Sequence, residues 1–203
     1  MNKVFITAIS LQGGKGLEKG IYKPDGIEFS SNIETSFPII PIIKEYMGRA
    51  EDVKVIAIRT ENNDVKDNFE AFLAELAELK IQEDQVEAIS IEENQNKTIG
   101  FSALMQIIDE IPEDSLVYAD ITYGTKPMSV IILYAMNFIE KLKDAEVAGI
   151  YYGELPRDKG VSKWEKAKLY DLTAFKYLSD VIEQLNGLAI SDPRTALKNI
   201  IDM

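Results

Sequence analysis

The chain of 203 residues contains no cysteine and no histidine. This excludes disulfides, thiolate or imidazole metal ligands, cysteine nucleophiles and any catalysis that depends on a histidine base. Long apolar runs are also missing, since no segment approaches the ~20 apolar residues that a membrane-spanning helix needs. The opening MNKVFITAIS is too short for a signal peptide. We therefore expect a cytoplasmic protein with no membrane contact, no metal and no cofactor.

Basic residues are scarce, with 22 Lys and Arg against 34 Asp and Glu, and the net charge is −12. Such a field repels long nucleic acids, which are therefore not expected as partners. A small phosphorylated ligand stays compatible with the composition. A local cluster of backbone N–H groups with one or two cations can hold an anion against the global charge.

Apolar runs of strand length alternate with amphipathic segments of helical period along most of the chain. The predicted strands are residues 3–10, 52–60, 85–91, 115–122 and 145–153. The predicted helices are residues 36–47, with the start held back to Pro41, residues 65–79 with Asp64 as the cap, and residues 99–111 and 128–140. This order predicts an α/β fold, a Rossmann-like, mostly parallel sheet flanked by helices with right-handed crossovers.

Smaller elements are expected around this sheet. KPDG within residues 20–30 predicts a short hairpin, and the segment after residue 153 predicts an edge hairpin. Residues 177–188 and the segment from Ser191 predict a short C-terminal helical appendage. The expected division is a sheet domain over residues 1–175 and helices over residues 176–203 that dimerise or connect to an effector.

The strand, turn and helix over residues 115–140 carry the strongest chemical signal. Asp120, Thr122, Gly124, Thr125 and Lys126 lie where the strand becomes the helix. N–H groups at a helix start are unpaired, the helix dipole is positive there, and Gly lets the chain approach an anion closely. This pattern predicts a phosphate site.

Other strand-to-helix loops are expected at the same edge of the sheet and together predict a cleft. The candidate ligand residues on them are Ser10, Leu11, Gln12, Gly13, Thr60, Asn62 and Thr98. A plain turn at the glycines after Ser10 and a solvated loop at Lys97 and Thr98 are open alternatives. The chain has no GxGxxG fingerprint and no P-loop, which weakens an ordinary mononucleotide site.

DITYGTKPMS, after its apolar strand, resembles the motif of CRISPR-associated Rossmann-fold (CARF) domains of the Csm6 and Csx1-like group. YYGEL and KLYDLTAF add weaker similarity, and the resemblance covers most of residues 1–175. It implies a homodimer with one symmetric pocket for a cyclic oligoadenylate, the second messenger of type III CRISPR immunity. Thr122, Tyr123, Gly124, Thr125 and Lys126 would line that pocket with the first loop. Relatives often carry His or Gly at the position of Tyr123, so any role of an imidazole is lost here.

Three functions follow from these patterns. The first is a sensor that binds cyclic oligoadenylate, with the tetra-adenylate ring favoured over the hexa- and tri-adenylate rings, and signals to a fused or separate effector. The second is a ring nuclease in which Lys126, Thr125 and Ser10 assist attack by a ribose 2′-hydroxyl. The third is another nucleotide-binding α/β protein. A HEPN ribonuclease is excluded because its RxxxxH motif needs histidine, and the length leaves no room for an effector domain.

Overall fold

The computed structural model describes residues 2–12, 17–25, 29–30, 32–60, 63–92, 96–154, 167–187 and 192–201. Its centre is a sheet of seven strands that runs, in spatial order, through β3 (Lys23–Asp25), β9 (Lys168–Asp171), β8 (Glu146–Glu154), β7 (Leu116–Asp120), β1 (Lys3–Ala8), β5 (Val53–Thr60) and β6 (Val86–Ile91). The five strands from β8 to β6 are parallel, β9 pairs antiparallel with β8, and the edge strand β3 runs parallel to β9. The predicted Rossmann-like, mostly parallel sheet flanked by helices is confirmed. The segment expected as an edge hairpin supplies β9, which pairs with β8 as expected but is covered on its outer side by β3.

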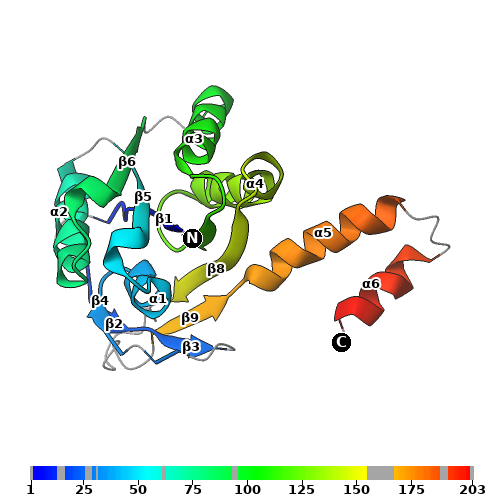
Figure 1. Ribbon diagram of the computed structural model, residues 1–203, viewed down its shortest axis with the longest axis horizontal. Coiled ribbons are helices and arrows are strands. Elements are labelled where there is room, and N and C mark those ends of the chain that lie inside the picture. The colour runs from blue at the N-terminus through cyan, green and yellow to red at the C-terminus, as the bar shows by residue number, and fades with distance from the viewer. Residues whose placement is uncertain are drawn as a thin grey trace.

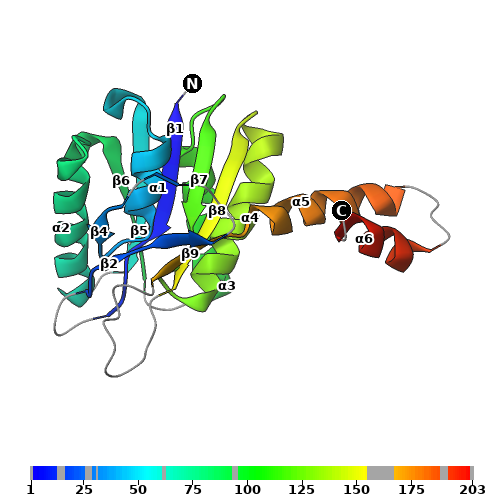
Figure 2. The ribbon, with the colours of Figure 1, turned by 90° about the horizontal axis from the view of Figure 1, so that it is seen from below.

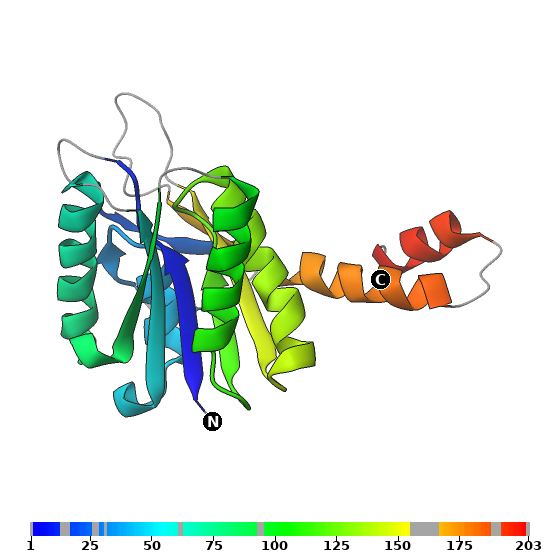
Figure 3. The same ribbon diagram turned by 90° about the horizontal axis from the view of Figure 1, so that it is seen from above.

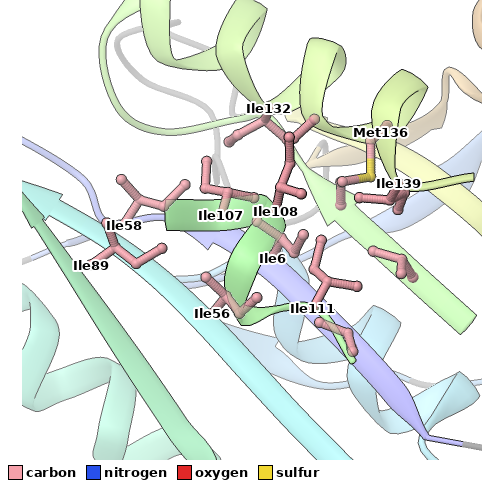
Figure 4. Packing of buried hydrophobic residues seen from close by; sticks show 14 of the residues in the cluster. Ile6, Ile56, Ile58, Ile89, Ile107, Ile108, Ile111, Ile132, Met136 and Ile139 are labelled. Carbon is pink, nitrogen blue, oxygen red and sulfur yellow. The ribbon is translucent and has the colours of Figure 1, made fainter. Parts of the chain in front are cut away.

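Helices cover both faces of the sheet (Figure 1). On one face lie α1 (Ile39–Tyr46) and α2 (Asn63–Glu78), and on the other α3 (Lys97–Glu110) and α4 (Lys126–Leu142). Each parallel strand is buried on both sides and alternates its side chains between two cores. In β1, for example, Phe5 packs under α1 while Ile6 packs under α3 and α4. Figure 4 shows the second of these cores, which is made mainly of isoleucines.

The strands of the parallel sheet are almost entirely apolar, so the sequence pattern locates them well. The shortest strands and the turns have no such pattern in the sequence. The first helix begins at Ile39, earlier than the predicted start at Pro41. Pro41 fits the third helical position because the N–H that it lacks would have no intrahelical partner there.

The hairpin predicted around KPDG is wrong. Two short strands occur there, but β2 (Gly20–Ile21) pairs with β4 (Glu34–Thr35), and β3 pairs in parallel with β9. Residues 26–28 of the expected hairpin lie outside the described part of the chain. Two single-turn 3-10 helices, Ala50–Asp52 and Glu83–Gln85, lead into β5 and β6.

The last two helices, α5 (Thr173–Gly187) and α6 (Pro193–Ile201), project away from the sheet (Figures 1 and 2). Thr173 fixes the root of α5, since its Oγ1 accepts a 2.9 Å hydrogen bond from the Ile150 N–H of β8. The buried Lys176 ammonium also pairs there with Glu140 of α4 and with Asp180. In the described part of the chain, no helix is long and apolar enough to cross a membrane.

Candidate functional site

The site lies where the direction of strand order reverses. From β1 the chain builds outward to β5 and β6, then returns to place β7 on the other side of β1. The chain leaves β1 toward the α1 face and leaves β7 toward α4, and open α/β sheets bind their ligands at such a switch point, outside the carboxyl ends of the strands. Figure 3 shows the parallel strands with α3 and α4 in front. The loop after β1 and the loop after β7 both lie at this end of the sheet.

The motif loop, residues 121–126, owes its path to a glycine. Gly124 has a φ of +88°, and a Cβ atom there would lie 2.8 Å from the Cβ of Ala8 at the end of β1. Any other residue would meet both the backbone strain of positive φ and this contact. The loop after β7 therefore lies directly against the end of β1.

The Asp120 carboxylate organises the base of the motif loop. Its Oδ1 accepts the Thr122 N–H at 2.9 Å and also the Thr122 hydroxyl, while its Oδ2 accepts the Thr7 hydroxyl at 3.0 Å. Thr122 Oγ1 in turn accepts the Gly153 N–H of β8 at 2.7 Å. The proton of the Thr122 hydroxyl is thus directed at Asp120, and the network joins β1, β7 and β8 beneath the loop.

Asp120 is completely buried. Burial raises the pKa of its carboxyl from 3.8 to about 6, although the hydrogen bonds from Thr122 and Thr7 act in the opposite direction. Desolvation is therefore the dominant effect on this acid. Among the described residues, it has no ion-pair partner.

The start of α4 carries free hydrogen-bond donors. Thr125 is the N-cap residue but makes no side-chain capping bond, and Pro127 occupies the second helical position. Within the part of the chain that the structure describes, the N–H groups of Gly124, Thr125 and Lys126 have no acceptor, and the exposed Lys126 has no ion partner. A helix start with free N–H groups and a free ammonium attracts an anion.

Tyr123 anchors the motif loop. Its hydroxyl donates a 2.8 Å hydrogen bond to the Ser36 carbonyl, and its ring meets Phe37 edge-on, with 6.4 Å between ring centroids. Burial raises the pKa of Tyr123 to about 12, so the phenol is neutral at physiological pH. The side chain ties the loop to the segment before α1.

An amide from α2 shapes the loop after β1. The Asn68 side chain donates from Nδ2 to the Ser10 carbonyl at 2.8 Å and to the Gln12 carbonyl at 2.9 Å. Ser10 is buried, and its hydroxyl accepts the Gln12 N–H at 3.2 Å. Leu11 and Gln12 are exposed.

The remaining predicted ligand residues are more scattered. Thr60, at the end of β5, is buried, and its hydroxyl oxygen has no partner among the described groups. Thr98 is exposed at the start of α3, where Asn96 caps the helix by accepting the N–H groups of Thr98 and Ile99. Gly13 and Asn62 lie outside the described residues. Residues 10–12 and the motif loop follow two neighbouring strands at the same edge of the sheet. The ligand contacts of all these residues stay predictions.

An apolar groove of about 600 Å³ lies between α3 and α4 and reaches the motif loop at Thr125. Large apolar side chains beside it are between 43% and 60% exposed: Phe101 and Met105 on α3, and Val130, Tyr134, Phe138 and Leu142 on α4. The α4 residues recur every fourth position, so they form one stripe along the helix. We call these six residues the α3–α4 face.

The sequence patterns did not identify three contributors to this site. Thr7 and Asn68 look like ordinary members of a strand and a helix, and their roles depend on the register of β1 against β7 and on the packing of α2. The α3–α4 face looks like core until the sheet is built. A polar residue inside the apolar stripe of α2 was the one available signal for Asn68.

Among the described residues, no group of three or more Asp and Glu side chains is placed to hold a metal ion. The hydrogen bonds of Asp120 hold the motif loop from beneath. Free N–H groups, Lys126 and the adjacent groove form the accessible part of the site.

Comparison with known proteins gives one family. The family model described as the Card1 CARF domain matches residues 34–178. No curated protein matches the chain. Among solved structures, Enterococcus italicus Csm6 bound to cyclic hexa-2′-fluoro-hexa-dAMP is similar with a TM-score of 0.46 and 14% sequence identity, covering 99% of this chain. The chain spans 54% of the length of that protein. Because the family model matches well over half of its residues, the chain belongs to the Card1 CARF domain family.

Proposed function

We propose that the chain is the ligand-binding domain of a cyclic oligoadenylate sensor in type III CRISPR defence. The observation that carries the proposal is the motif loop of a CARF-family chain, whose free N–H groups and exposed Lys126 lie at the carboxyl end of β7, against the end of β1. A phosphate of the ring would receive hydrogen bonds from the loop and charge from Lys126. The net charge of −12 favours such a small ligand over a long nucleic acid.

The proposed sensor is a homodimer that meets through the α3–α4 face. Six large apolar side chains are exposed there, and no other described segment covers them. Patches of this kind on soluble proteins mark interaction sites. The groove inside the face reaches Thr125, so a two-fold pairing would bring two motif loops to one pocket. A cyclic ligand with two-fold symmetry fits such a pocket.

The signal would leave the sensor through its C-terminal helices. In this scheme, residues 1–175 bind the ligand, and residues 176–203 pass the change to a fused or separate effector. The root of α5 is bonded to β8, and β8 is bonded to the motif loop through Thr122. Ligand binding shifts the population of two conformations only if the ligand binds one of them better.

A ring nuclease is the second candidate, favoured by the unpaired Lys126 beside the hydroxyl of Thr125. A ribose 2′-hydroxyl oxygen would attack the adjacent phosphorus while the bond from phosphorus to the 5′ oxygen breaks. The proton lost by the 2′-hydroxyl ends on the departing 5′ oxygen, and a 2′,3′-cyclic phosphate forms. Lys126 would stabilise the added negative charge, with Thr125 and Ser10 orienting the phosphate.

Calorimetry with cyclic tri-, tetra- and hexa-adenylate tests the sensor, and chromatography of the ring after incubation tests the nuclease. We expect binding, tightest for the tetra-adenylate ring. If none of the rings binds, both ideas fail and another nucleotide ligand has to be sought. A ring that stays intact in a long incubation eliminates the nuclease alone.

Lys126→Ala is the sharpest variant for this test. Loss of one charge-assisted contact to phosphate should weaken ring binding by ~10-fold or more, since such contacts contribute ~1.5–3 kcal/mol. Lys143→Ala is the matched control, because it removes the same charge from the other end of α4. Equal affinities of the two variants would place Lys126 outside the pocket.

A further inference from the structure

The hydrogen bonds around Asp120 divide between its two carboxylate oxygens. Oδ1 holds both donors of Thr122, while Oδ2 has a single described partner, the Thr7 hydroxyl at 3.0 Å. Thr7 Oγ1 also lies 3.4 Å from the carbonyl oxygen of Ala8. The Thr7 hydroxyl therefore has two acceptors within reach.

This arrangement accommodates a neutral acid as well as a carboxylate. When Oδ2 carries a proton, it can donate to Thr7 Oγ1, and the Thr7 hydroxyl can turn its own proton to the Ala8 carbonyl. Oδ1 keeps both bonds from Thr122 in either state. The base of the motif loop thus stays hydrogen-bonded whether or not Asp120 is charged.

The surroundings of Asp120 offer little to neutralise it. Among the described residues, the titratable groups that interact with it are Tyr22 and Tyr123, and both phenols are neutral because burial raises their pKa. Glu75 of α2 acts on the same two tyrosines and adds negative charge. The pKa of Asp120 is already raised to about 6 by burial, so a modest further change moves it into the physiological range.

We propose that anion binding at the motif loop is coupled to the uptake of one proton by Asp120. The inference rests on the proposed function, because it concerns the same loop. An anion held by the N–H groups of residues 124–126 adds a second negative charge close to the buried carboxylate, and like charges disfavour the ionised form. The proton comes from solvent, no bond of the ligand changes, and the bound anion and the proton favour each other reciprocally.

The direct test measures the dissociation constant of cyclic tetra-adenylate between about pH 5.5 and pH 8, on either side of the Asp120 pKa. Phosphodiesters keep a constant charge in this range. A rise of about one unit in the Asp120 pKa makes binding ~10-fold tighter at the acid end. Calorimetry in two buffers of different ionisation enthalpy should register proton uptake at neutral pH. An affinity that does not change with pH, with no proton uptake, overturns the coupling.

Asp120→Asn keeps the Oδ1 acceptor and places an amide donor opposite Thr7, so it imitates the protonated acid. It should bind at least as tightly as wild type at pH 7.5, with no pH dependence across the range. If it retains the wild-type pH dependence, Asp120 is not the group that takes up the proton. If Asp120→Asn fails to fold, Thr7→Val takes its place. This variant removes the Thr7 hydrogen bond that lowers the pKa of Asp120, so the midpoint of the pH dependence of binding should move upward.

A probe other than the proposed ligand separates the coupling from the proposed function. Trimetaphosphate is a small cyclic anion of constant charge, and the pKa of Asp120 can be followed by carboxyl carbon NMR with and without it. A higher pKa in its presence supports the coupling even if no oligoadenylate ring binds, in which case only the proposed function fails. If neither the rings nor trimetaphosphate raises the pKa, the coupling is wrong.

Discussion

Replacement of Gly124 by alanine is the strictest test of how the motif loop is built. The new methyl group would lie 2.8 Å from the Cβ of Ala8, well inside the ~3.5–4.0 Å at which carbon atoms attract. The φ of +88° adds a backbone cost of ~1–2 kcal/mol for an L-residue. Relief of such an overpacked contact costs a further ~1–3 kcal/mol. Together these effects predict a loss of about 2–5 kcal/mol in the free energy of unfolding.

Gly100 of α3 supplies a matched control for the same chemical change. A methyl group at this position would meet only the Cδ1 of Ile131, at an ordinary 3.5 Å. Alanine in a helix is favoured over glycine by ~0.8–1 kcal/mol, so Gly100→Ala should stabilise the protein slightly. The two alanine variants should therefore change stability in opposite directions.

Urea unfolding followed by far-UV circular dichroism measures both variants against wild type. Ring binding by Gly124→Ala should also weaken, since the loop has to move away from β1 to admit the methyl group. If Gly124→Ala is as stable as Gly100→Ala, the close approach of the motif loop to β1 is wrong. The Asp120 network would then need another geometry.

Three further predictions use other parts of the structure. The folded-state pKa of Asp120, about 6, lies above its ordinary value of 3.8, so wild type should lose stability as the pH rises through 6. Between about pH 5 and 7.5, the free energy of unfolding of wild type should fall by ~1.4 kcal/mol relative to that of Asp120→Asn, as measured by urea unfolding. If the difference in stability between the two proteins does not change with pH, the prediction is wrong. Phe138→Glu should give a single-chain mass by light scattering, whereas Ile182→Glu, a similarly exposed site on α5, should leave the dimer intact. A dimer that survives Phe138→Glu excludes the α3–α4 face as the interface. Lys176→Met removes two ion pairs at the root of α5 and should lower its protection from hydrogen exchange by about 1–3 kcal/mol, with α2 unchanged as the internal control. Equal protection of α5 in both proteins would show that these pairs do not hold the root.

The sequence predicts the central sheet because its strands are buried on both faces and appear as unbroken apolar runs. It fails where pairing depends on distant chain segments. Nothing local in Lys23–Asp25 indicates that its partner is Lys168–Asp171, and the predicted KPDG hairpin follows from turn chemistry alone. The start of α1 differs for a simpler reason, since a proline is tolerated throughout the first helical turn.

The candidate site likewise has one part that the sequence predicts and another that it does not. The motif around Gly124 and Lys126 is local, so its residue types alone predict an anion loop. Its supports are not local: Thr7 meets Asp120 because the two are register partners in β1 and β7. Asn68 reaches Ser10 only because α2 packs beside the end of β1. Periodicity assigns such residues to a strand or a helix but cannot indicate which polar group they will meet.

The projecting α5 has a mechanical consequence. With 15 residues at 1.5 Å each, the helix is about 22 Å long, and the bonds to the sheet domain that its described side chains make lie in its first turns. A rotation of about 10° at Thr173 would carry the far end through about 4 Å. A small rotation at the root of α5, where the helix is bonded to β8, is therefore amplified into a displacement of several ångströms at its far end.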